Sequence, residues 1–413
     1  MAATWGNAQV PSMRRSVGKW RAGLALGILG LLAACSAGDL AFGPGATVGG
    51  PSVGATSQPV VSGRTLGRGP VRVALLLPLS GDAGLSAVGT SMANAAELAI
   101  GFIESNPNIG ENITLLLKDT GATTQGAASA TSQALAEGAS LVLGPLRADQ
   151  VTAAGGVARA AGVSVIAFSN NTGAAAPGVF LLNVLPETEA RRTLRYATKL
   201  GKKAYAAIFP TTDFGRIQES AFRQATADLG LNARAIYNFS SEAEARTIVS
   251  QLVPMLQAGQ VDALFIPDRA TAPSFGNLLA EAGITPGSVQ LIGSGDWNND
   301  AAIANTTALA GAIFPAVDEA GLRALTSEYQ ARYGGAPHPL ATLAYTATIL
   351  ANASSLSNAT PRYDRAMLTI PTGFSGRDGA FRFFEDGRSE FALTIRQVTI
   401  GGSSVAEAAP TRF

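Results

Sequence analysis

The chain has 413 residues, of which 47% are hydrophobic and 14% are charged, so it can bury a sizeable core and hold two or three domain-sized units. Its 30 basic and 29 acidic side chains nearly cancel, and no Lys/Arg-rich run follows the first 21 residues, so we expect no nucleic-acid partner. One cysteine and one histidine exclude an internal disulfide and a Cys/His zinc cluster, so we expect no metal and no cofactor.

The first segment has the pattern of an export signal. Basic residues over 13–21 precede an apolar run over 22–34, and these 13 apolar residues are too few to span a membrane. The stretch before Met13 has no place in such a signal. We therefore expect translation to begin at Met13.

The apolar run ends in Leu32–Cys35 (LAAC), which resembles the lipobox of bacterial lipoproteins. The resemblance implies that 1–35 is a lipoprotein signal peptide and that Cys35 is lipid-modified. An ordinary cleavage site followed by an unrelated thiol is the alternative. Ser36, in place of the Asp that retains enterobacterial lipoproteins at the inner membrane, favours the periplasmic side of the outer membrane, in its inner leaflet.

Residues 36–70 are rich in Gly, Pro, Ser and Thr and have no hydrophobic periodicity, so they read as a flexible tether. From Val71 onward, short β-branched or Leu-rich runs alternate with Ala-rich stretches at helical period. The expected strands of this first series cover 71–77, 112–119, 140–144 and 163–168, and its helices cover 89–104, 124–137 and 148–161.

A second series with the same alternation begins after Asn183. Its expected helices cover 187–200, 216–229, 242–258 and 272–283, and its strands cover 203–210, 233–239, 261–267 and 288–293. The strand runs of the first series are apolar instead of alternating, which fits a parallel sheet covered on both faces. Two such lobes in succession imply a cleft between them, and open parallel sheets bind ligands beyond the carboxyl ends of their strands.

Short motifs in a fixed order then suggest a family. They are Leu77–Gly81 (LPLSG), Lys118–Thr120 (KDT), Leu143–Pro145 (LGP), Val165–Ser169 (VIAFS), Asp213–Gly215 (DFG), Phe374–Gly376 (FSG) and Asp378–Phe383 (DGAFRF). Together they resemble the leucine/isoleucine/valine-binding-protein superfamily. The resemblance implies the type I periplasmic-binding fold, an α/β fold of two lobes, each a mainly parallel sheet flanked by helices, with three interlobe crossings.

The same resemblance implies the domain boundaries. The binding domain would cover 71–400, followed by a C-terminal tail over 401–413. Lobe one would comprise 71–184 plus 318–370, and lobe two would comprise 185–317 plus 371–400.

Four residues after lobe-one strands are candidates for the cleft. Arg147 could clamp a carboxylate or phosphate, or it could be a solvated residue at a helix start. Ser80, Ser169 and Asn170 could hold a small polar ligand, or they could cap the helices that follow.

Lobe two offers a second set of candidates. Asp213, Asp268 and Asp296 each follow an expected strand and could meet an ammonium group, although Asp is also a common turn former. Trp297 could stack on a ligand, or simply pack in the core. Phe214 stands where amino-acid-binding members of the family usually carry a Tyr, and Leu146 and Arg147 stand where they usually carry a Ser-Ser or Ser-Thr pair.

The sequence predicts a protein without catalytic residues. No nucleophile elbow and no phosphate-binding P-loop occur, and His338 reads as structural. The Gly-Pro-Leu motif, the lipobox and the tether together resemble penicillin-binding protein activators, lipoproteins that stimulate a peptidoglycan synthase by contact. We therefore expect a membrane-anchored regulator of peptidoglycan synthesis. The alternative is the substrate-binding component of an ABC-type uptake system, with a permease as partner and an amino-acid-like ligand; a hydrolase using the cleft carboxylates is a remote third reading.

Overall fold

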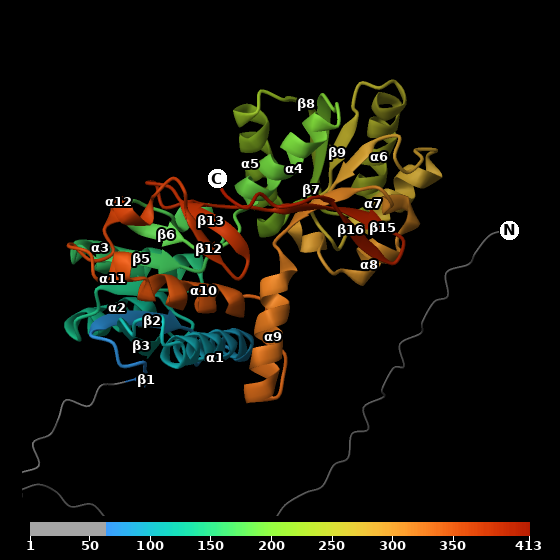
Figure 1. Cartoon of the computed structure of the whole chain (residues 1–413). Coiled ribbons are helices and arrows are strands. Elements are labelled where there is room, and N and C mark those ends of the chain that lie inside the picture. The colour runs from blue at the N-terminus through green and yellow to red at the C-terminus, as the bar shows by residue number, and fades with distance from the viewer. Residues whose placement is uncertain (1–62) are drawn as a thin grey trace, which may run out of the picture. The chain divides into compact units, whose positions relative to one another are not determined.

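The computed structural model describes residues 63–413, so Cys35 and nearly all of the expected tether lie outside the described residues. Within 63–413, no helix is both long enough and apolar enough to cross a membrane. This part of the chain folds into two α/β lobes, as expected (Figure 1).

Lobe one is built on a six-stranded sheet in the order β1-β3-β2-β4-β5-β6, parallel except for the edge strand β1. Its strands are β1 Thr65–Leu66, β2 Val71–Leu77, β3 Ile113–Asp119, β4 Leu141–Leu143, β5 Ser164–Ala167 and β6 Val179–Leu181. Its helices are α1 Ala83–Ser105, α2 Thr124–Ala136, α3 Ala148–Ala160, α9 Glu319–Tyr333, α10 Ala341–Asn352, α11 Ser354–Ser357 and α12 Arg365–Leu368.

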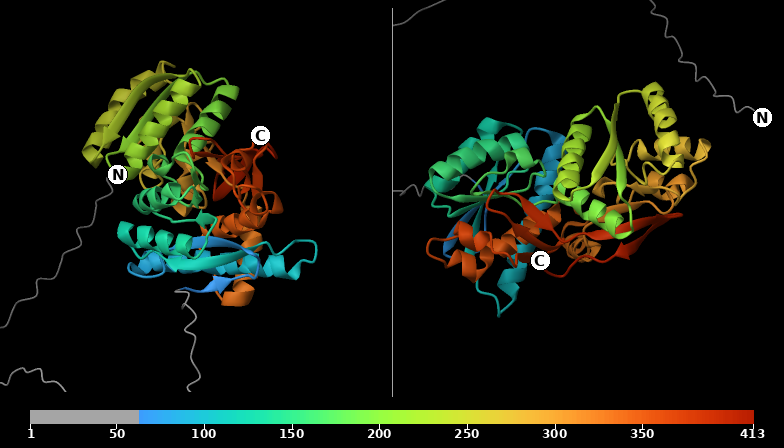
Figure 2. Two further views of the ribbon diagram at one scale, coloured as in Figure 1. Left: turned by 90° about the vertical axis from the view of Figure 1, so that its left-hand side faces the viewer. Right: turned by 90° about the horizontal axis from the view of Figure 1, so that it is seen from above.

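Strand β2 shows why its sequence is apolar apart from Arg72. Val73 and Leu75 belong to one buried cluster with residues of α1 and α10, whereas Ala74 and Leu76 belong to another with residues of α2 and α3. Helices therefore cover both faces of the sheet (Figure 2). Side chains that point to either face of this strand are buried under a helix.

Lobe two is built on a seven-stranded sheet in the order β16-β15-β11-β10-β9-β7-β8, parallel from β11 to β8 and antiparallel at β15 and β16. Its strands are β7 Ala204–Pro210, β8 Asn232–Phe239, β9 Ala263–Phe265, β10 Gln290–Ile292, β11 Ile313–Ala316, β15 Thr394–Thr399 and β16 Gly402–Glu407. Its helices are α4 Pro186–Lys199, α5 Asp213–Asp228, α6 Glu242–Gln257, α7 Ala272–Glu281 and α8 Ala301–Asn305.

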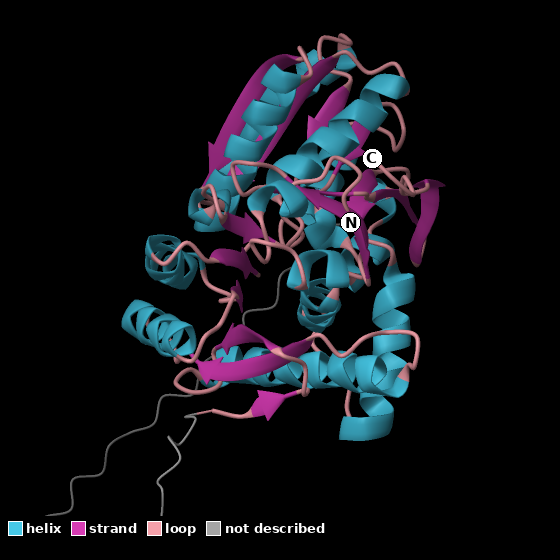
Figure 3. Cartoon of the chain, turned by 60° about the vertical axis from the view of Figure 1, so that its left-hand side comes forward, coloured by secondary structure: helices cyan, strands magenta, loops and turns pink. Residues whose placement is uncertain are grey.

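The lobe-two sheet is also enclosed on both faces. Helices α4 and α5 bury Leu194 and Phe222 on one face, while α6 and α7 bury Leu252 and Phe275 on the other. Figure 3 shows the resulting layers of helix and strand in both lobes. The expected α/β fold, with mainly parallel sheets flanked by helices, is confirmed.

The carboxyl-terminal part of the chain is divided differently from the expectation. A small antiparallel sheet is formed by β12 Phe374–Gly376, β13 Gly379–Phe383 and β14 Ser389–Phe391. The sequence predicts these residues in lobe two, with 371–400. Phe381, Phe383 and Phe391 are buried in the lobe-one cluster, so this sheet packs on lobe one. Residues 402–407, expected to lie in a tail, form the edge strand of lobe two.

Three segments of chain therefore connect the lobes. They run from β6 to α4, from β11 to α9, and from β14 to β15, so the third crossing lies at Ala392 and Leu393 instead of after residue 370.

Helix starts follow their capping residues. Helix α1 begins at Ala83, ahead of the expected residue 89, because the Asp82 side chain accepts a hydrogen bond from the Leu85 N–H at 2.8 Å. Helix α5 begins at Asp213, ahead of the expected residue 216, because Thr212 Oγ1 accepts from the Gly215 N–H at 3.2 Å.

The position of the small sheet gives a stability prediction. Phe383 is 1% exposed and its ring lies 5.3 Å from that of Phe180 on β6. Phe383→Ala should lower the free energy of unfolding by about 3–5 kcal/mol, because it opens a cavity in the lobe-one core. Urea denaturation followed by circular dichroism measures this loss. The control Met367→Ala, at a side chain that is 38% exposed, should change the value by no more than about 0.5 kcal/mol, and an equally small loss for Phe383→Ala would contradict the packing.

Candidate ligand-binding site

Ser80 lies at the carboxyl end of β2 and is bound to Asp119 at the end of the neighbouring strand β3. The Ser80 hydroxyl donates to Asp119 Oδ2 at 2.5 Å, and the N–H groups of Leu79 and Gly121 each donate to Asp119 Oδ1 at 2.8 Å. Burial raises the pKa of Asp119, but these hydrogen bonds outweigh burial and hold the pKa below its ordinary value. Asp119 stays ionised and fixes the loop, while the Ser80 oxygen can still accept a hydrogen bond from a ligand.

Arg147 occupies the N-cap position of α3 without a side-chain capping hydrogen bond. Its guanidinium instead pairs with Asp149 in the first turn, with Nε 3.1 Å from Oδ1 and Nη2 3.3 Å from Oδ2. The hydrogen bond from Arg147 lowers the pKa of Asp149. The Arg147 side chain is 46% exposed, so an incoming anion could reach it but would compete with Asp149.

The loop after β5 separates two neighbouring candidates. Ser169 is 5% exposed and its Oγ accepts a hydrogen bond from the Asn171 N–H at 3.2 Å, so its role is to stabilise the turn. Asn170 is exposed, and no hydrogen bond holds its side chain within residues 63–413. Asn170 is thus the member of this pair that can meet a ligand.

Asp213 and Phe214 open helix α5 in lobe two. The Asp213 side chain is 88% exposed and forms an ion pair with Arg216 one turn later. Phe214 is half-buried. Asp213 is therefore more solvated than a deep contact with an ammonium group would require.

Asp268 and Asp296 lie together at the carboxyl ends of β9 and β10. Asp268 Oδ2 accepts from the Thr271 hydroxyl at 2.6 Å, and Asp296 Oδ2 lies 3.6 Å from the Nε of Arg269. Burial raises the pKa of Asp296; attraction to Arg269 opposes the shift, and the negative charge of Asp268 adds to it. Arg269 is thus paired with Asp296, and Asp268 adds a second carboxylate at this edge of the sheet.

Glu189, in the first turn of α4, is a third carboxyl at this edge and was not predicted. Its Oε1 lies 2.2 Å from the position that a Cβ on Gly295 would occupy, so the side chain fits only because residue 295 is a glycine. Burial raises the pKa of Glu189 to about 8, with a smaller contribution from Asp296, while the Gly295 N–H opposes the shift. No local sequence signal distinguishes Glu189 from Glu187, because its burial depends on a loop far along the chain.

A cavity of about 660 Å³ lies where the loops after β5 and β7 meet. Lobe one contributes Asn171 and Thr172, and lobe two contributes Glu187, Asp213, Arg216, Ile217 and Ser220. The Thr172 hydroxyl donates to Glu187 Oε1 at 2.8 Å, which links the two lobes beside the cavity. The volume is in the usual range for small-molecule sites. Among the predicted residues, Asp213 lines this cavity.

Two further residues take structural roles. Trp297 is 1% exposed and packs against Phe314, with ring centroids 6.4 Å apart, so it belongs to the lobe-two core. His338 Nδ1 accepts a hydrogen bond from the Leu340 N–H at 3.2 Å just before α10. Within residues 63–413, no group of three or more His, Cys, Asp or Glu side chains is placed to hold a metal ion.

The raised pKa of Glu189 gives a pH-dependent stability. Between pH 4.5 and about 8 the folded protein keeps a proton that the unfolded chain has lost, so rising pH favours unfolding over this range. In Glu189→Gln this loss of stability is absent. From pH 5 to pH 8, the free energy of unfolding of the wild type should therefore fall by at least about 1.4 kcal/mol relative to that of the variant. Urea denaturation across this range measures the difference. The exposed Glu281→Gln serves as the control, and parallel pH profiles for wild type and Glu189→Gln would refute the assignment.

Several solved structures share this architecture. A putative branched-chain amino acid ABC transporter protein from Rhodospirillum rubrum matches with a TM-score of 0.69 and 20% identity, over 81% of this chain and 99% of that one. A substrate-binding protein from Desulfitobacterium hafniense in complex with Leu has a TM-score of 0.58 and 18% identity, over 81% and 99%. A solute-binding protein from R. palustris in complex with benzoate has a TM-score of 0.54 and 19% identity, over 84% and 98%. At these identities the likeness shows a shared fold.

The amino-acid sequence itself gives the family. No curated protein matches the chain. The model of the family described as "Periplasmic binding protein" matches residues 70–399, which include all three crossings and both lobes except the edge strands β1 and β16. The chain therefore belongs to the periplasmic binding protein family.

Proposed function

We propose that the protein is the substrate-binding component of an ABC-type uptake system, and that it delivers an amino acid or a related small carboxylate to a permease. The family match over 70–399 carries this proposal, because periplasmic binding proteins bind ligands between two lobes. The proteins of similar structure are described as ABC transporter components, two of them with Leu or benzoate bound.

The charges around the strand ends support a ligand with both a carboxylate and a cationic group. On lobe one, Arg147 and the first N–H groups of α3 favour an anion. On lobe two, Asp268 and Asp296 outnumber Arg269 and favour a cation. Glu189 adds a neutral carboxyl near pH 7, which ionises more readily when a cation approaches.

This proposal replaces the first expectation from the sequence. That expectation was an activator of a penicillin-binding protein, and the comparisons offer no support for it, whereas the ABC transporter alternative agrees with every similar structure named above. We accordingly propose an ABC permease as the partner, in place of a peptidoglycan synthase.

The location of the protein is a separate part of the proposal. The family is periplasmic, and we propose that Cys35 carries a lipid that anchors the domain to a membrane through the segment 36–70. A lipid-anchored receptor would remain close to its permease, which raises the effective concentration of each for the other.

A ligand-binding experiment tests the function. Isothermal titration of the purified protein with branched-chain amino acids should identify one saturable ligand. Asp296→Asn should weaken binding of a cationic ligand at least about tenfold, the effect of losing about 1.4 kcal/mol of attraction. Glu281→Gln, which changes an exposed carboxyl elsewhere in lobe two, should leave affinity unchanged. If none of these amino acids binds, the uptake function loses its basis.

Lipid anchoring can be tested on the full chain in a Gram-negative host. Wild type should sediment with membranes and incorporate labelled fatty acid, whereas Cys35→Ala should do neither, because the chain has no second thiol to take the lipid. The fractionation and the label are read in the same cells. An unlabelled wild type, or a Cys35→Ala variant that still sediments with membranes, would show that Cys35 is not the anchor.

A further inference from the structure

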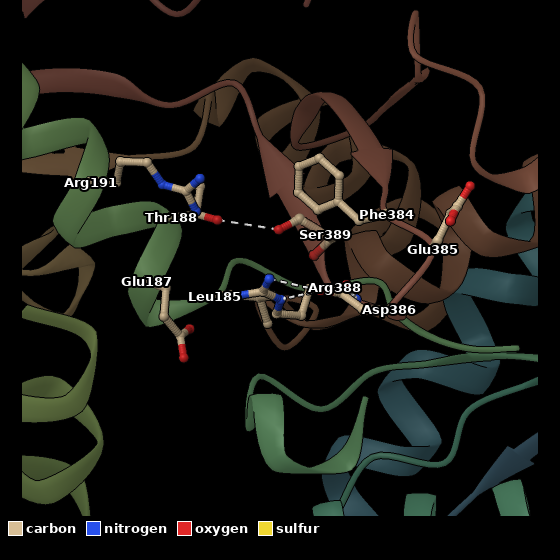
Figure 4. A pocket seen from close by; sticks show the side chains of 9 residues that line it. All are labelled: Leu185, Glu187, Thr188, Arg191, Phe384, Glu385, Asp386, Arg388 and Ser389. Atoms are coloured by element: carbon tan, nitrogen blue, oxygen red, sulfur yellow. Dashed lines mark hydrogen bonds and ion pairs between the residues drawn. The ribbon is translucent and has the colours of Figure 1, made fainter. Parts of the chain in front are cut away.

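A second cavity, of about 400 Å³, lies beside the crossings on the side of the β13–β14 turn (Figure 4). We call it the hinge pocket. Leu185, Glu187 and Arg191 line it from the start of lobe two, and Phe384, Asp386 and Arg388 line it from lobe one. It shares Glu187 with the 660 Å³ cavity but none of the other residues there.

The walls of the hinge pocket are held by hydrogen bonds between the lobes. The Thr188 hydroxyl donates to the Ser389 carbonyl at 3.2 Å, and the Ser389 hydroxyl donates to the Asn183 carbonyl at 2.8 Å. On the lobe-one wall, the Leu181 N–H donates to the Gly387 carbonyl at 2.8 Å. The pocket is therefore a built feature of the crossing and not a gap between loose side chains.

Arg191 is the chemically distinctive group in the pocket. It is half-buried, yet within residues 63–413 it makes no hydrogen bond and no ion pair. Its natural partner on the helix is Glu187, four residues earlier. Glu187 instead accepts from Thr172 through Oε1, and Figure 4 shows its carboxylate pointing away from Arg191. The guanidinium thus faces the pocket with all its donors available.

The remaining lining residues limit what Arg191 can bind. Arg388 adds a second guanidinium, already paired with Asp386 at 2.7 Å. Three carboxylates, Glu187, Glu385 and Asp386, also line the pocket and repel any anion in proportion to its charge, so a singly charged anion is opposed least. Phe384 is half-buried and offers apolar surface beside the charge, whereas Leu185 is only 1% exposed and lies behind that wall.

From these observations we propose that the hinge pocket is a second ligand site, which binds a small monocarboxylate with an apolar body. The carboxylate pairs with the fork of Arg191, and the apolar body lies against Phe384. This site is separate from the cleft ligand of the proposed function and does not depend on it.

Benzoate is a suitable probe, with benzamide as its uncharged match. Isothermal titration of wild type should show benzoate binding and no benzamide binding. Arg191→Gln should weaken benzoate binding about tenfold or more, through the loss of a bidentate charge-assisted contact. Arg191→Lys keeps the charge but not the fork, and should fall between the two. Arg195→Gln, one turn later on α4 and exposed, is the matched control and should bind like wild type.

Titration of Arg147→Gln with benzoate tests whether the probe binds in the cleft instead of the hinge pocket. Benzoate binding that survives Arg147→Gln and fails in Arg191→Gln supports the hinge pocket, provided that Arg191→Gln keeps the wild-type melting midpoint. Phe384→Ala gives an independent check, since it removes apolar wall without touching the charge, and it should also weaken benzoate. Binding that fails in Arg147→Gln but survives in Arg191→Gln places benzoate in the cleft and overturns the proposal, as does an absence of benzoate binding to wild type at millimolar concentration.

Discussion

Burial of both faces of each parallel sheet is the constraint on which the rest of the structure depends. Neighbouring residues of one strand, such as Leu75 and Leu76, enter different hydrophobic clusters under different helices. The central strands leave little sheet surface for a ligand, so polar groups reach solvent mainly where strands end and on edge strands such as β8. The loops after β2, β4 and β5 in lobe one, and after β7, β9 and β10 in lobe two, therefore carry the polar chemistry of the protein.

The same constraint explains which parts of the fold the sequence predicts well. Apolar runs such as 73–77 identify buried strands without knowledge of their neighbours, and the structure places these residues in β2. Strand β11 is short and contains Pro315, and it pairs with β15 at the far end of the chain. Short strands whose partners lie far away carry little local signal, so the sequence located neither β11 nor the small sheet that packs on lobe one.

Prediction of the site is incomplete for a related reason. The sequence found the loops, because a polar residue after an apolar strand is a local pattern, but it could not find the partner of each side chain. Arg147 pairs with Asp149 two residues away, and Ser169 accepts a hydrogen bond from the backbone of its own turn. Burial raises the pKa of Glu189, and this burial involves a contact with Gly295 that exists only after lobe two has folded.

The first turns of α4 bring these features together. Glu187 contacts lobe one through Thr172, Glu189 faces the edge of the lobe-two sheet at Gly295, and Arg191 faces the hinge pocket. The next residue, Arg192, donates to the Leu393 carbonyl at 2.8 Å in the third crossing and to Glu407 Oε1 at 2.6 Å on β16. One rigid helix thus contacts the cleft, the hinge pocket and a crossing. A ligand that moves α4 from either pocket changes the contacts of the other, and by thermodynamic linkage the effect of each ligand on the affinity of the other is equal.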